Sequence, residues 1–600
     1  MALKKTIKYF MWGFQHHFCG GLEVEAGLLF ERLSPKLNPK VFLIGVLEDE
    51  GVEGHPVCVE PEDCGISVDA FANIKERASA LYESHPNKNM WHSVEHAHKI
   101  FHAQLQDECF SNAVQEILDK HFGKAGISSF LSHPIVILGY KVIVVLQFKK
   151  IILGSLCFLS KDKHLLGGSK HHEINLSRSL LESVIHVFLR ESFLALRSPM
   201  PGQYLQIMER DYDEIIRDGG VNFMTSIALR SSDEGYSATR LFPMFHSVSA
   251  LNYEGRAGSG RLIISKKGHP NVKTVLLFKH EIRLSNSRGI RALLELTTHE
   301  SYLLTNGEAA YGVGELQGTY GPDNEDLFVV EFEGHYNWKV LHNHKTVMVV
   351  KAGYPSVSRP PIDTEKFKSD LQRIFTKFNT GDIELLWELS TAASHQKHGA
   401  LLIISDGAAE EAVRLSGSGT LIAPIKVTSG LIGQITSIDG AILLDKHCTC
   451  YAVGAILDGD ATSKGKTTRG SRYNSAIRYV EHISPKYKSL AIIVSSDGTV
   501  DIYPDLLPQI SKVELEKHVD TLKEQAELES VAYENIRESI VWLNDHRSYL
   551  TKKYCDEANT AYSKIKPKLK YEGLMIVLNI LRPNEEIDDS YFIESNESPS

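Results

Sequence analysis

A proline-rich segment near residue 360 divides this chain into two differently patterned parts. Residues 354–361 read Tyr-Pro-Ser-Val-Ser-Arg-Pro-Pro, a composition typical of linkers because proline continues neither a helix nor a central strand. A chain of 600 residues is also too long for one hydrophobic core, so several domains are expected. We therefore predict a linker at 355–363 as the main domain boundary.

The composition is that of an ordinary globular protein. Hydrophobic residues make up 42% and charged residues 23% of the chain. The net charge of −10 gives no strong nucleic-acid signal. The most apolar stretch, Ile135 to Leu159, contains lysines and never reaches the ~18 apolar residues of a membrane span, so we interpret it as two buried strands. The absence of a secretory pattern and eight scattered cysteines favour a cytoplasmic protein without a membrane partner.

Two patterns precede the linker. Strand-like runs alternate with helical segments such as Leu176 to Phe193 in residues 1–200, which predicts an N-terminal α/β domain. Short alternating runs between Gly- and Asn-containing turns then predict a β-rich domain over 201–354. No chemical constellation stands out in either part.

Helices and short apolar strands alternate beyond the linker. Apolar residues from Phe367 to Phe378 recur at helical spacing, and a second helix is expected from Ile383 to Ser394. Such alternation indicates an α/β sheet with covered faces, here a domain over 364–509. The strands expected in it are 400–405, 441–444, 452–457 and 491–495.

Residues 510–582 are expected to be helical. Apolar residues from Leu515 to Leu543 keep a 4-3-4-3 spacing that is broken only by Glu529, which suggests a coiled-coil seam. A helix packing on its own domain would give the same spacing, so both interpretations stay open. The tail, 583–600, is acidic and rich in Ser and Asn, and is predicted to be disordered.

Three segments of the 395–505 region carry residues suited to nucleotide chemistry. Asp439-Gly440-Ala441 leads into a strand, Arg469 to Ala476 leads into a helix, and Val494 to Gly498 ends a strand. A Gly-Ser turn before a helix presents unpaired N–H groups to a phosphate, and Arg472 can contact phosphate oxygens bidentately. The Asp439 carboxylate can hold Mg²⁺ or Mn²⁺, or take a proton. Taken singly, the same residues make an ordinary turn and a helix cap.

Together these segments resemble the motifs of the diadenylate cyclase family. Members carry D-G-A, which residues 439–441 match, and later G-T-R-H-R-A-A, which Gly470, Arg472 and Ala476 match. Residues 397–400 resemble the family's K-H-G-A, and Val494-Ser495 the start of its V-S-E-E. The run over 453–480, with R-Y-N-S-A in place of R-H-R-A-A, is similar to a branch with a large N-terminal region that resembles a sensor.

The sequence also departs from the family pattern. Tyr473 and Asn474 stand where the family has a histidine and a second arginine, so one charge that would hold a triphosphate is missing. Ser496-Asp497 replaces a pair of glutamates, which removes a carboxylate. The residues expected to restore the positive charge are Lys464, Lys466 and Arg469.

The resemblance implies a mixed sheet flanked by helices and an enzyme that joins two ATP into cyclic di-AMP and two pyrophosphates. Asp439 and Arg472 would be catalytic, with Asp439 as the ligand of Mg²⁺ or Mn²⁺. Two ATP-loaded domains would have to face each other, which implies a homo-oligomer. The alternative is a catalytically inactive nucleotide-binding module that signals to sensor domains. The nucleotide-binding residues implied are Gly440, Ala441, Gly470, Ser471, Arg472, Asn474, Ser495, Lys464, Lys466 and Arg469.

Overall fold

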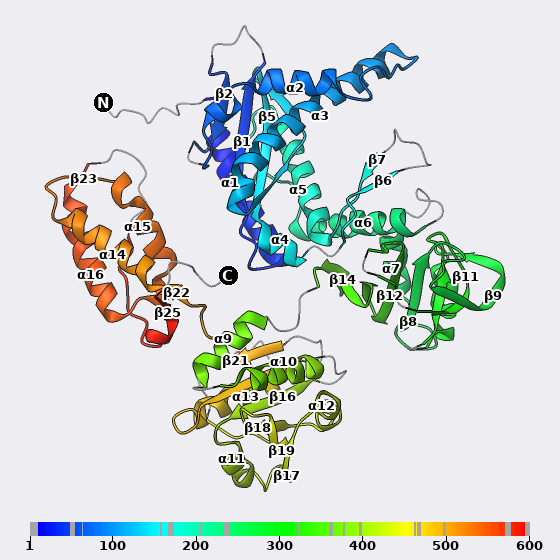
Figure 1. The fold of residues 1–600 in the computed structure, drawn as a ribbon, viewed down its shortest axis with the longest axis vertical. Helices are drawn as coiled ribbons and strands as arrows, with labels where there is room; N and C mark the ends of the chain where they lie inside the picture. The colour runs from blue at the N-terminus through cyan, green and yellow to red at the C-terminus, as the bar shows by residue number, and fades with distance from the viewer. Residues whose placement is uncertain are drawn as a thin grey trace. The chain divides into compact units, whose positions relative to one another are not determined.

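The computed structural model divides into two compact units, Thr6–Ser358 and Arg359–Ser600. It describes residues 10–594 except 49–53, 63, 157–158, 166–172, 205, 233–239, 299, 319, 322, 359–363, 376–377, 395–398, 461–463, 465–469, 496–499 and 571–577. The expected multidomain α/β organisation is confirmed (Figure 1). The division falls inside the predicted linker, whose first residues belong to strand β15 (Tyr354–Ser356).

The first sheet of the chain is covered by helices on both faces. Its strands are β1 (Lys40–Leu47), β2 (Val57–Glu60), β3 (Ile127–Leu131), β4 (Ile135–Ile137) and β5 (Tyr140–Lys149), and its helices are α1 (Gln15–Leu33), α2 (Ile74–Glu83), α3 (Glu95–Phe122) and α5 (Leu180–Leu196). The strand order is β2-β1-β5-β3, with β4 also paired to β5. Alternate residues of β5 pack against α1 and α5 on one face and against α2 and α3 on the other, which explains its nearly continuous apolar sequence.

The prediction of two buried strands over 135–159 is wrong in its second half. Strand β5 ends at Lys149, and the next residues form a short helix, α4 (Lys150–Leu156). Both Lys149 and Lys150 are exposed, so the lysine pair marks the point where the buried strand leaves the core. A separate two-stranded pair follows, β6 (Lys163–Leu165) with β7 (Glu173–Asn175).

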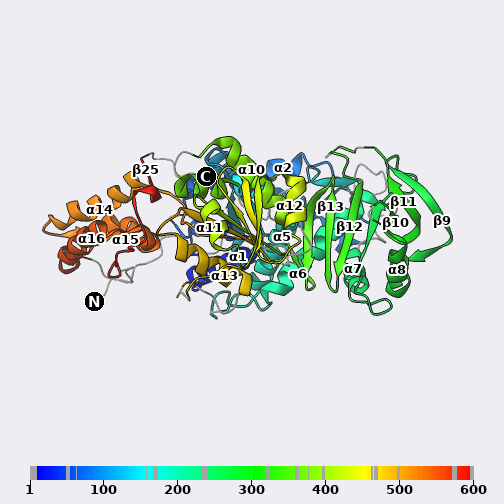
Figure 2. The ribbon, with the colours of Figure 1, turned by 90° about the horizontal axis from the view of Figure 1, so that it is seen from below.

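The second sheet has eight strands in the order β15-β14-β13-β12-β8-β10-β11-β9 (Figure 2). Its elements are α6 (Tyr212–Ser231), α7 (Leu241–Ser249), β8 (Gly260–Ser265), β9 (Val272–Arg283), α8 (Ser287–Leu293), β10 (Tyr302–Thr305), β11 (Ala309–Leu316), β12 (Leu327–Gly334), β13 (Asn337–His342) and β14 (Lys345–Lys351). Phe245 of α7 packs edge-on against Trp338 of β13, with ring centroids 5.9 Å apart. The range 201–354, predicted to be β-rich, therefore begins with two helices that cover the sheet.

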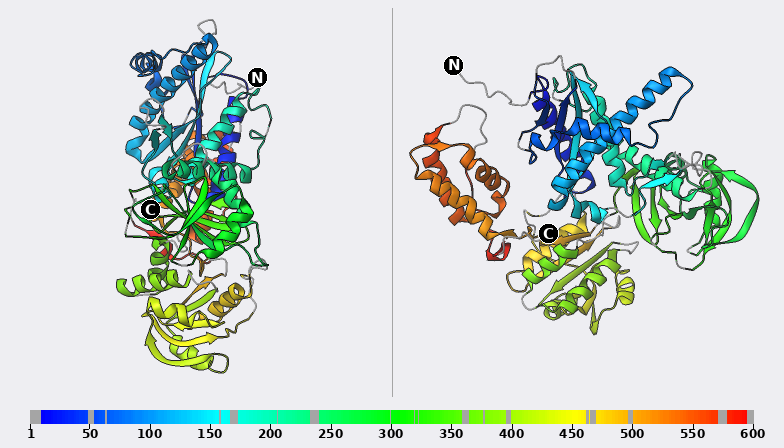
Figure 3. Two further views of the ribbon diagram at one scale, coloured as in Figure 1. Left: turned by 90° about the vertical axis from the view of Figure 1, so that its right-hand side faces the viewer. Right: turned by 45° about the horizontal axis from the view of Figure 1, so that its top comes forward.

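The third sheet belongs to the second unit (Figure 3). Its elements are α9 (Thr364–Ile374), α10 (Thr380–Ser394), β16 (Ala400–Ser405), α11 (Ala408–Arg414), β17 (Thr420–Lys426), α12 (Ser429–Ile435), β18 (Ala441–Leu444), β19 (Thr449–Ala455), α13 (Ser471–Ile483), β20 (Ser489–Val494) and β21 (Val500–Tyr503). The order is β17-β19-β18-β16-β20-β21, and β16 and β18 are parallel while the other neighbours are antiparallel. Helices α9, α10 and α12 cover one face, and α11 and α13 the other.

Strands β17 and β21 lie at the two edges of this sheet and were not predicted. Strand β17 contains Pro424, and its register against β19 shifts between Leu421 and Ile425. Proline is tolerated on an edge strand because its missing N–H faces away from the ladder. The same proline interrupts the sequence pattern that is typical of a strand, so the pattern does not predict β17.

The C-terminal helices pack on one another within their own domain. They are α14 (Lys512–Ala526), α15 (Glu534–Asp545) and α16 (Lys552–Ile565). The heptad positions from Leu515 to Leu543 are buried in one core with residues of α16, and Glu529 lies in the connection between α14 and α15. A single coiled-coil helix is therefore the wrong interpretation of this spacing, and packing on its own domain is the observed one.

We expect a core substitution here to affect stability and not assembly. Replacing the fully buried Ile540 with valine should lower the free energy of unfolding of this domain by about 0.5–1.5 kcal/mol. The matched change at Ile580, which is 85% exposed, should have no measurable effect. Thermal denaturation and sedimentation of both variants test this, and a changed sedimentation coefficient in Ile540→Val alone would show that the helix faces another chain.

The predicted disorder of 583–600 is wrong for residues 583–594. Strand β25 (Phe592–Ile593) pairs in parallel with β22 (Ile510–Ser511), and the buried Tyr591 stacks under the guanidinium of Arg373 at 4.1 Å. Ile587 is also buried. The few apolar side chains of this acidic segment are enough to hold it against the domain, and 595–600 lie outside the described residues. A second short pair, β23 (Val531–Ala532) with β24 (Leu569–Lys570), closes the helical domain.

None of the helices formed by the described residues is both long and apolar enough to cross a membrane.

Candidate functional site

The ends of four strands in the second unit meet at one edge of the third sheet. The pairing places the start of β16 beside the start of β18 and the end of β20, and Ala441 of β18 opposite Ala455 of β19. Residues that are far apart in the sequence, such as Asp439 before β18 and Ser495 after β20, therefore come to the same edge. At these strand ends, the loops that precede or follow the strands can contribute to one site.

A hollow of about 960 Å³ opens at this edge, between the strand ends and the start of α13. We call it the α13 hollow. Of the residues singled out in the sequence, it brings together Asp439, Gly440, Ala441, Gly470, Ser471, Arg472 and Ser495. The rest of its lining is Leu401, Gly454, Ala455, Ile456, Leu457, Tyr473 and Ser475, so one wall is mostly apolar.

Two glycines shape the turn that carries Asp439. Gly440 has φ +116° and Gly454 has φ +64°, conformations that side chains other than glycine rarely adopt. A Cβ at Gly440 would lie 2.6 Å from the carbonyl carbon of Gly454, so the two backbones approach too closely for any larger residue. Gly454 was not among the predicted site residues, although it lies in the run over 453–480 that carries part of the family resemblance.

The amino end of α13 faces the hollow, and its N-cap residue supplies no side-chain cap. Its N-cap, Gly470, has no side chain to accept the first N–H groups, and no acidic residue lies in the first turn. The side-chain amide of Asn474 donates to the Gly470 carbonyl oxygen at 3.2 Å and does not line the hollow. A helix start presents backbone N–H donors and partial positive charge, which suits a phosphate.

Helix α13 is held rigidly against the sheet. Ala476, Ile477 and Val480 are buried, and the Tyr479 hydroxyl donates to Glu411 of α11 at 2.9 Å. Burial, reinforced by that carboxylate, raises the pKa of Tyr479 well above its ordinary value. The tyrosine therefore stays protonated and keeps donating, which fixes the direction of the helix start.

Among the described residues, Arg472 and Asp439 are the charged ones that line the α13 hollow. Arg472 Nη2 lies 3.5 Å from Asp439 Oδ1, with side chains 34% and 95% exposed. The guanidinium also rests against Gly399, at the start of β16, where a Cβ would collide with it. A long, exposed ion pair of this kind contributes little to stability, so a stronger anion can displace Asp439 from Arg472 at small cost.

The structure does not bring Lys464 to the hollow. Its Nζ lies 3.1 Å from Glu586 Oε1 and 3.4 Å from Glu481 Oε2, so its charge is neutralised by carboxylates of the same unit. Lys466 and Arg469 lie outside the described residues, as do Ser496 and Asp497. The basic loop therefore contributes no described charge to the site, and Arg472 remains as the cation of the lining.

The residues present suit a metal that arrives with a nucleotide better than a resident one. No group of three or more His, Cys, Asp or Glu side chains in the described part of the chain is arranged to hold a metal. Asp439 offers a single exposed carboxylate. Mg²⁺ needs no more than one or two carboxylates when phosphates and waters supply its other ligands.

Comparison with protein families identifies two segments of the first unit. Residues 11–224 match the model described as probable sensor domain DACNG, and residues 239–344 match the one described as probable sensor domain DACNH. The first range contains the first sheet, and the second contains strands β8 to β13. Probable sensor domains therefore precede the unit that carries the α13 hollow.

These matches correct the resemblance drawn from the sequence. The matching models are sensor domains, and no catalytic family was found, so the identification of this chain as a diadenylate cyclase is wrong. The motifs at 439–441 and 470–476 are short, and the same residue types occur in ordinary turns and helix starts. Cyclase activity is not supported.

Other comparisons add little. No curated protein matches the chain. A solved structure titled as a hypothetical membrane spanning protein from Bacillus cereus is 20% identical over 22% of this chain and 64% of that chain, with a TM-score of 0.18. The chain thus spans less than two thirds of that structure, and a likeness this low carries no argument about fold or function. The findings that bear on function are the two probable sensor domains, at 11–224 and 239–344.

Proposed function

We propose that this chain is a sensor-linked nucleotide-binding protein, whose second unit binds a nucleoside triphosphate in the α13 hollow. One observation carries the proposal: the start of α13 and the Arg472 guanidinium line the same hollow as the Asp439-Gly440 turn. The probable sensor domains of the first unit support a signalling role over a metabolic one. The proposal concerns binding, and no reaction step is part of it.

The phosphates would sit at the start of α13. Backbone N–H groups at Gly470 and Ser471 and the fork of Arg472 offer donors to phosphate oxygens. The wall formed by Ile456 and Leu457 would lie along the base and sugar, since Ile456 is 68% exposed and lacks cover. Apolar surface with a few convergent polar groups is the usual make-up of a small-molecule site.

Asp439 would serve the bound nucleotide in one of two ways. Released from Arg472, its carboxylate can bind Mg²⁺ or Mn²⁺ carried by the phosphates, or accept a hydrogen bond from a ribose hydroxyl. Both uses need the carboxylate at the rim of the hollow, where the Gly440 N–H now donates to it at 3.1 Å.

Titration of the purified chain with ATP tests the proposal. With Mg²⁺ present, ATP should bind more tightly than AMP because its longer phosphate chain reaches both α13 and Arg472. Raising the ionic strength should weaken ATP binding more than AMP binding, since the Debye length falls to ~3 Å at 1 M salt. Calorimetry in low and high salt measures both effects. Equal affinity for ATP and AMP at every salt concentration would place the phosphates elsewhere and contradict the proposed site.

A further inference from the structure

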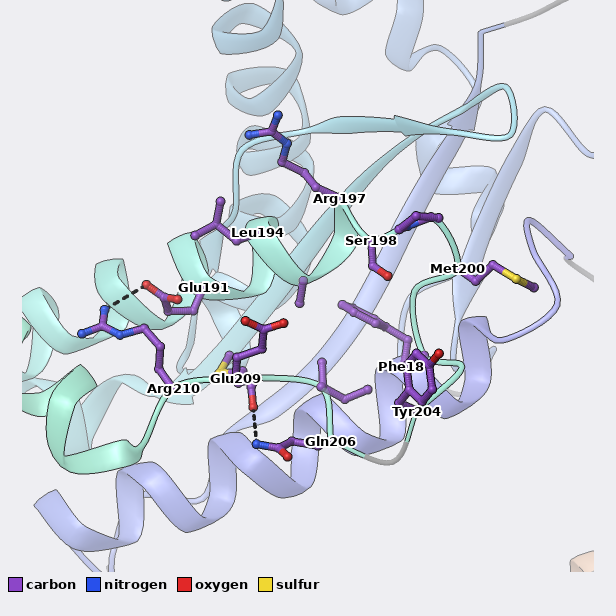
Figure 4. A pocket seen from close by; sticks show the side chains of 15 residues that line it. Phe18, Glu191, Leu194, Arg197, Ser198, Met200, Tyr204, Gln206, Glu209 and Arg210 are labelled. Carbon is purple, nitrogen blue, oxygen red and sulfur yellow. Dashed lines mark hydrogen bonds and ion pairs between the residues drawn. The ribbon is translucent and has the colours of Figure 1, made fainter.

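The first unit contains a second hollow that the nucleotide proposal does not use. It has a volume of about 530 Å³ and lies between the carboxyl end of α5 and a wall of residues 197–204 and 206–210, beside α1 (Figure 4). We call it the α5 hollow. It falls inside the range matched by a probable sensor domain, 11–224. Its volume is within the range of pockets that hold small organic molecules, roughly 300–1,000 Å³.

The wall formed by residues 197–204 and 206–210 is fixed in place by contacts with α1 and the turn before it. The indole N–H of Trp12 donates to the Pro201 carbonyl oxygen at 2.9 Å. A Cβ at Gly202 would lie 2.6 Å from the Phe14 carbonyl oxygen, so the chain passes α1 at the closest distance a backbone allows. Glu25 of α1 accepts the backbone N–H of Ile207 at 3.0 Å. These contacts fix the position of this wall of the hollow.

The charges around the α5 hollow leave one carboxylate without a partner. Arg210 is held by Glu191 at 3.2 Å and by Asp218 at 2.8 Å, and the Arg197 guanidinium points away from the hollow in Figure 4. The Glu209 carboxylate points into the space between α5 and the wall (Figure 4), and within the described residues it has no hydrogen bond or ion pair. The carboxyl end of α5 adds negative partial charge at the same place.

Large apolar side chains that face solvent line the same hollow as the exposed Glu209. Leu194 is 46% exposed, Met200 49% and Tyr204 73%, and all three line the hollow. Exposed apolar groups gathered in one hollow are a feature of ligand-binding grooves. They would cover the body of a ligand, and the Tyr204 ring also offers its face to a cation.

From this arrangement we propose that the α5 hollow binds a small organic amine, an ammonium group joined to an apolar body. The ammonium would pair with Glu209, and the Ser198 hydroxyl lines the same hollow. The apolar body would lie on Leu194, Met200 and Tyr204. A carboxylate in a partly apolar hollow prefers a cation that also fills the apolar space over a hydrated metal ion. This site is separate from the α13 hollow, so its test is independent of nucleotide binding.

Three matched probes applied to the full chain test the charge requirement. 2-Phenylethylamine should bind, while 2-phenylethanol and 3-phenylpropionate, which keep the ring but lack the cation, should bind at least about tenfold more weakly. Calorimetry or ligand-observed NMR gives the three affinities. Equal binding of the amine and the alcohol, or no binding of the amine, would overturn the proposal.

Two variants and a control test the location. Glu209→Gln should weaken amine binding at least about tenfold and leave 2-phenylethanol binding unchanged, because only the ion pair is lost. Tyr204→Ala should weaken both ligands. Glu76→Gln, an exposed carboxylate of α2 outside the hollow, should change neither. ATP affinity should be the same in all of these proteins. Unchanged amine binding in Glu209→Gln would place the amine elsewhere and refute the site.

Discussion

Replacing Arg230 with methionine should destabilise the first unit by about 3–5 kcal/mol, because it leaves the buried carboxylate of Glu325 without its cation. The side chains of Arg230 and Glu325 are 2% and 0% exposed, and Arg230 Nε lies 3.1 Å from Glu325 Oε2. Desolvation by burial lowers the pKa of Arg230 below its usual value, with Glu325 opposing that shift. Water does not solvate either buried charge. Removing one charge of this pair therefore costs far more stability than breaking an exposed ion pair.

This buried pair also joins the two probable sensor domains. Glu325, in the range 239–344, accepts the Ser160 hydroxyl at 2.9 Å and the Lys161 backbone N–H at 3.3 Å, both in the range 11–224. Arg230, at the end of α6, donates to the Lys161 carbonyl oxygen and to Ser226. We therefore expect the loss of Arg230 to weaken the contact between the two domains and also the packing of each domain next to that contact.

Calorimetric unfolding, with hydrogen exchange to assign the transition to residues 6–358, measures the change. The control is Arg32→Met, whose partner Asp213 forms a pair in which both side chains are about half exposed, and it should cost no more than about 1 kcal/mol. The double variant Arg230→Met with Glu325→Gln should recover part of the loss, because the orphan charge is gone. Equal losses of unfolding free energy in Arg230→Met and Arg32→Met would show that the buried pair does not stabilise the first unit more than an exposed pair does.

The third sheet shows how far sequence patterns can go. Strands β16 and β18 begin and end where apolar runs predicted, because short apolar runs bounded by polar turns have few alternatives inside an α/β domain. The Asp439-Gly440 turn and the start of α13 were predicted to lie together, and the strand order places both at one edge. The site also depends on pairing between strands that are distant in the sequence. A local sequence pattern does not predict which strands pair.

The failures have physical causes as well. Heptad spacing reports that one helix face is buried but not which chain covers it, so Leu515 to Leu543 fitted a coiled coil equally well. The positive charge of Lys464 suggested a phosphate partner, yet its ion-pair partners are Glu481 and Glu586. Glu586 lies 122 residues after Lys464 in the sequence. Short motifs likewise specify local geometry and do not establish family membership. The families that match this chain lie in the first unit.

The last expectation concerns Arg472, whose replacement with alanine should weaken ATP binding roughly 10- to 150-fold. Hydrogen bonds to a charged group contribute about 1.5–3 kcal/mol, and about 1.4 kcal/mol corresponds to tenfold in affinity. Arg472 is the cation at the start of α13, and the described lining of the hollow contains no second cation to replace it. Its present partner, Asp439, is 95% exposed and would be solvated by water, so the fold should keep its stability within about 0.5 kcal/mol.

Two further variants separate the charge of Arg472 from its geometry. Arg472→Lys keeps the positive charge but loses the planar fork, so ATP affinity should fall between those of the wild type and Arg472→Ala. Arg547→Ala removes an exposed arginine of the helical domain and should leave binding unchanged. Calorimetric titration with ATP, checked by thermal unfolding of each variant, gives the comparison. If Arg472→Ala binds ATP as the wild type does, the phosphates do not lie at the start of α13, and the α13 hollow is not the nucleotide site.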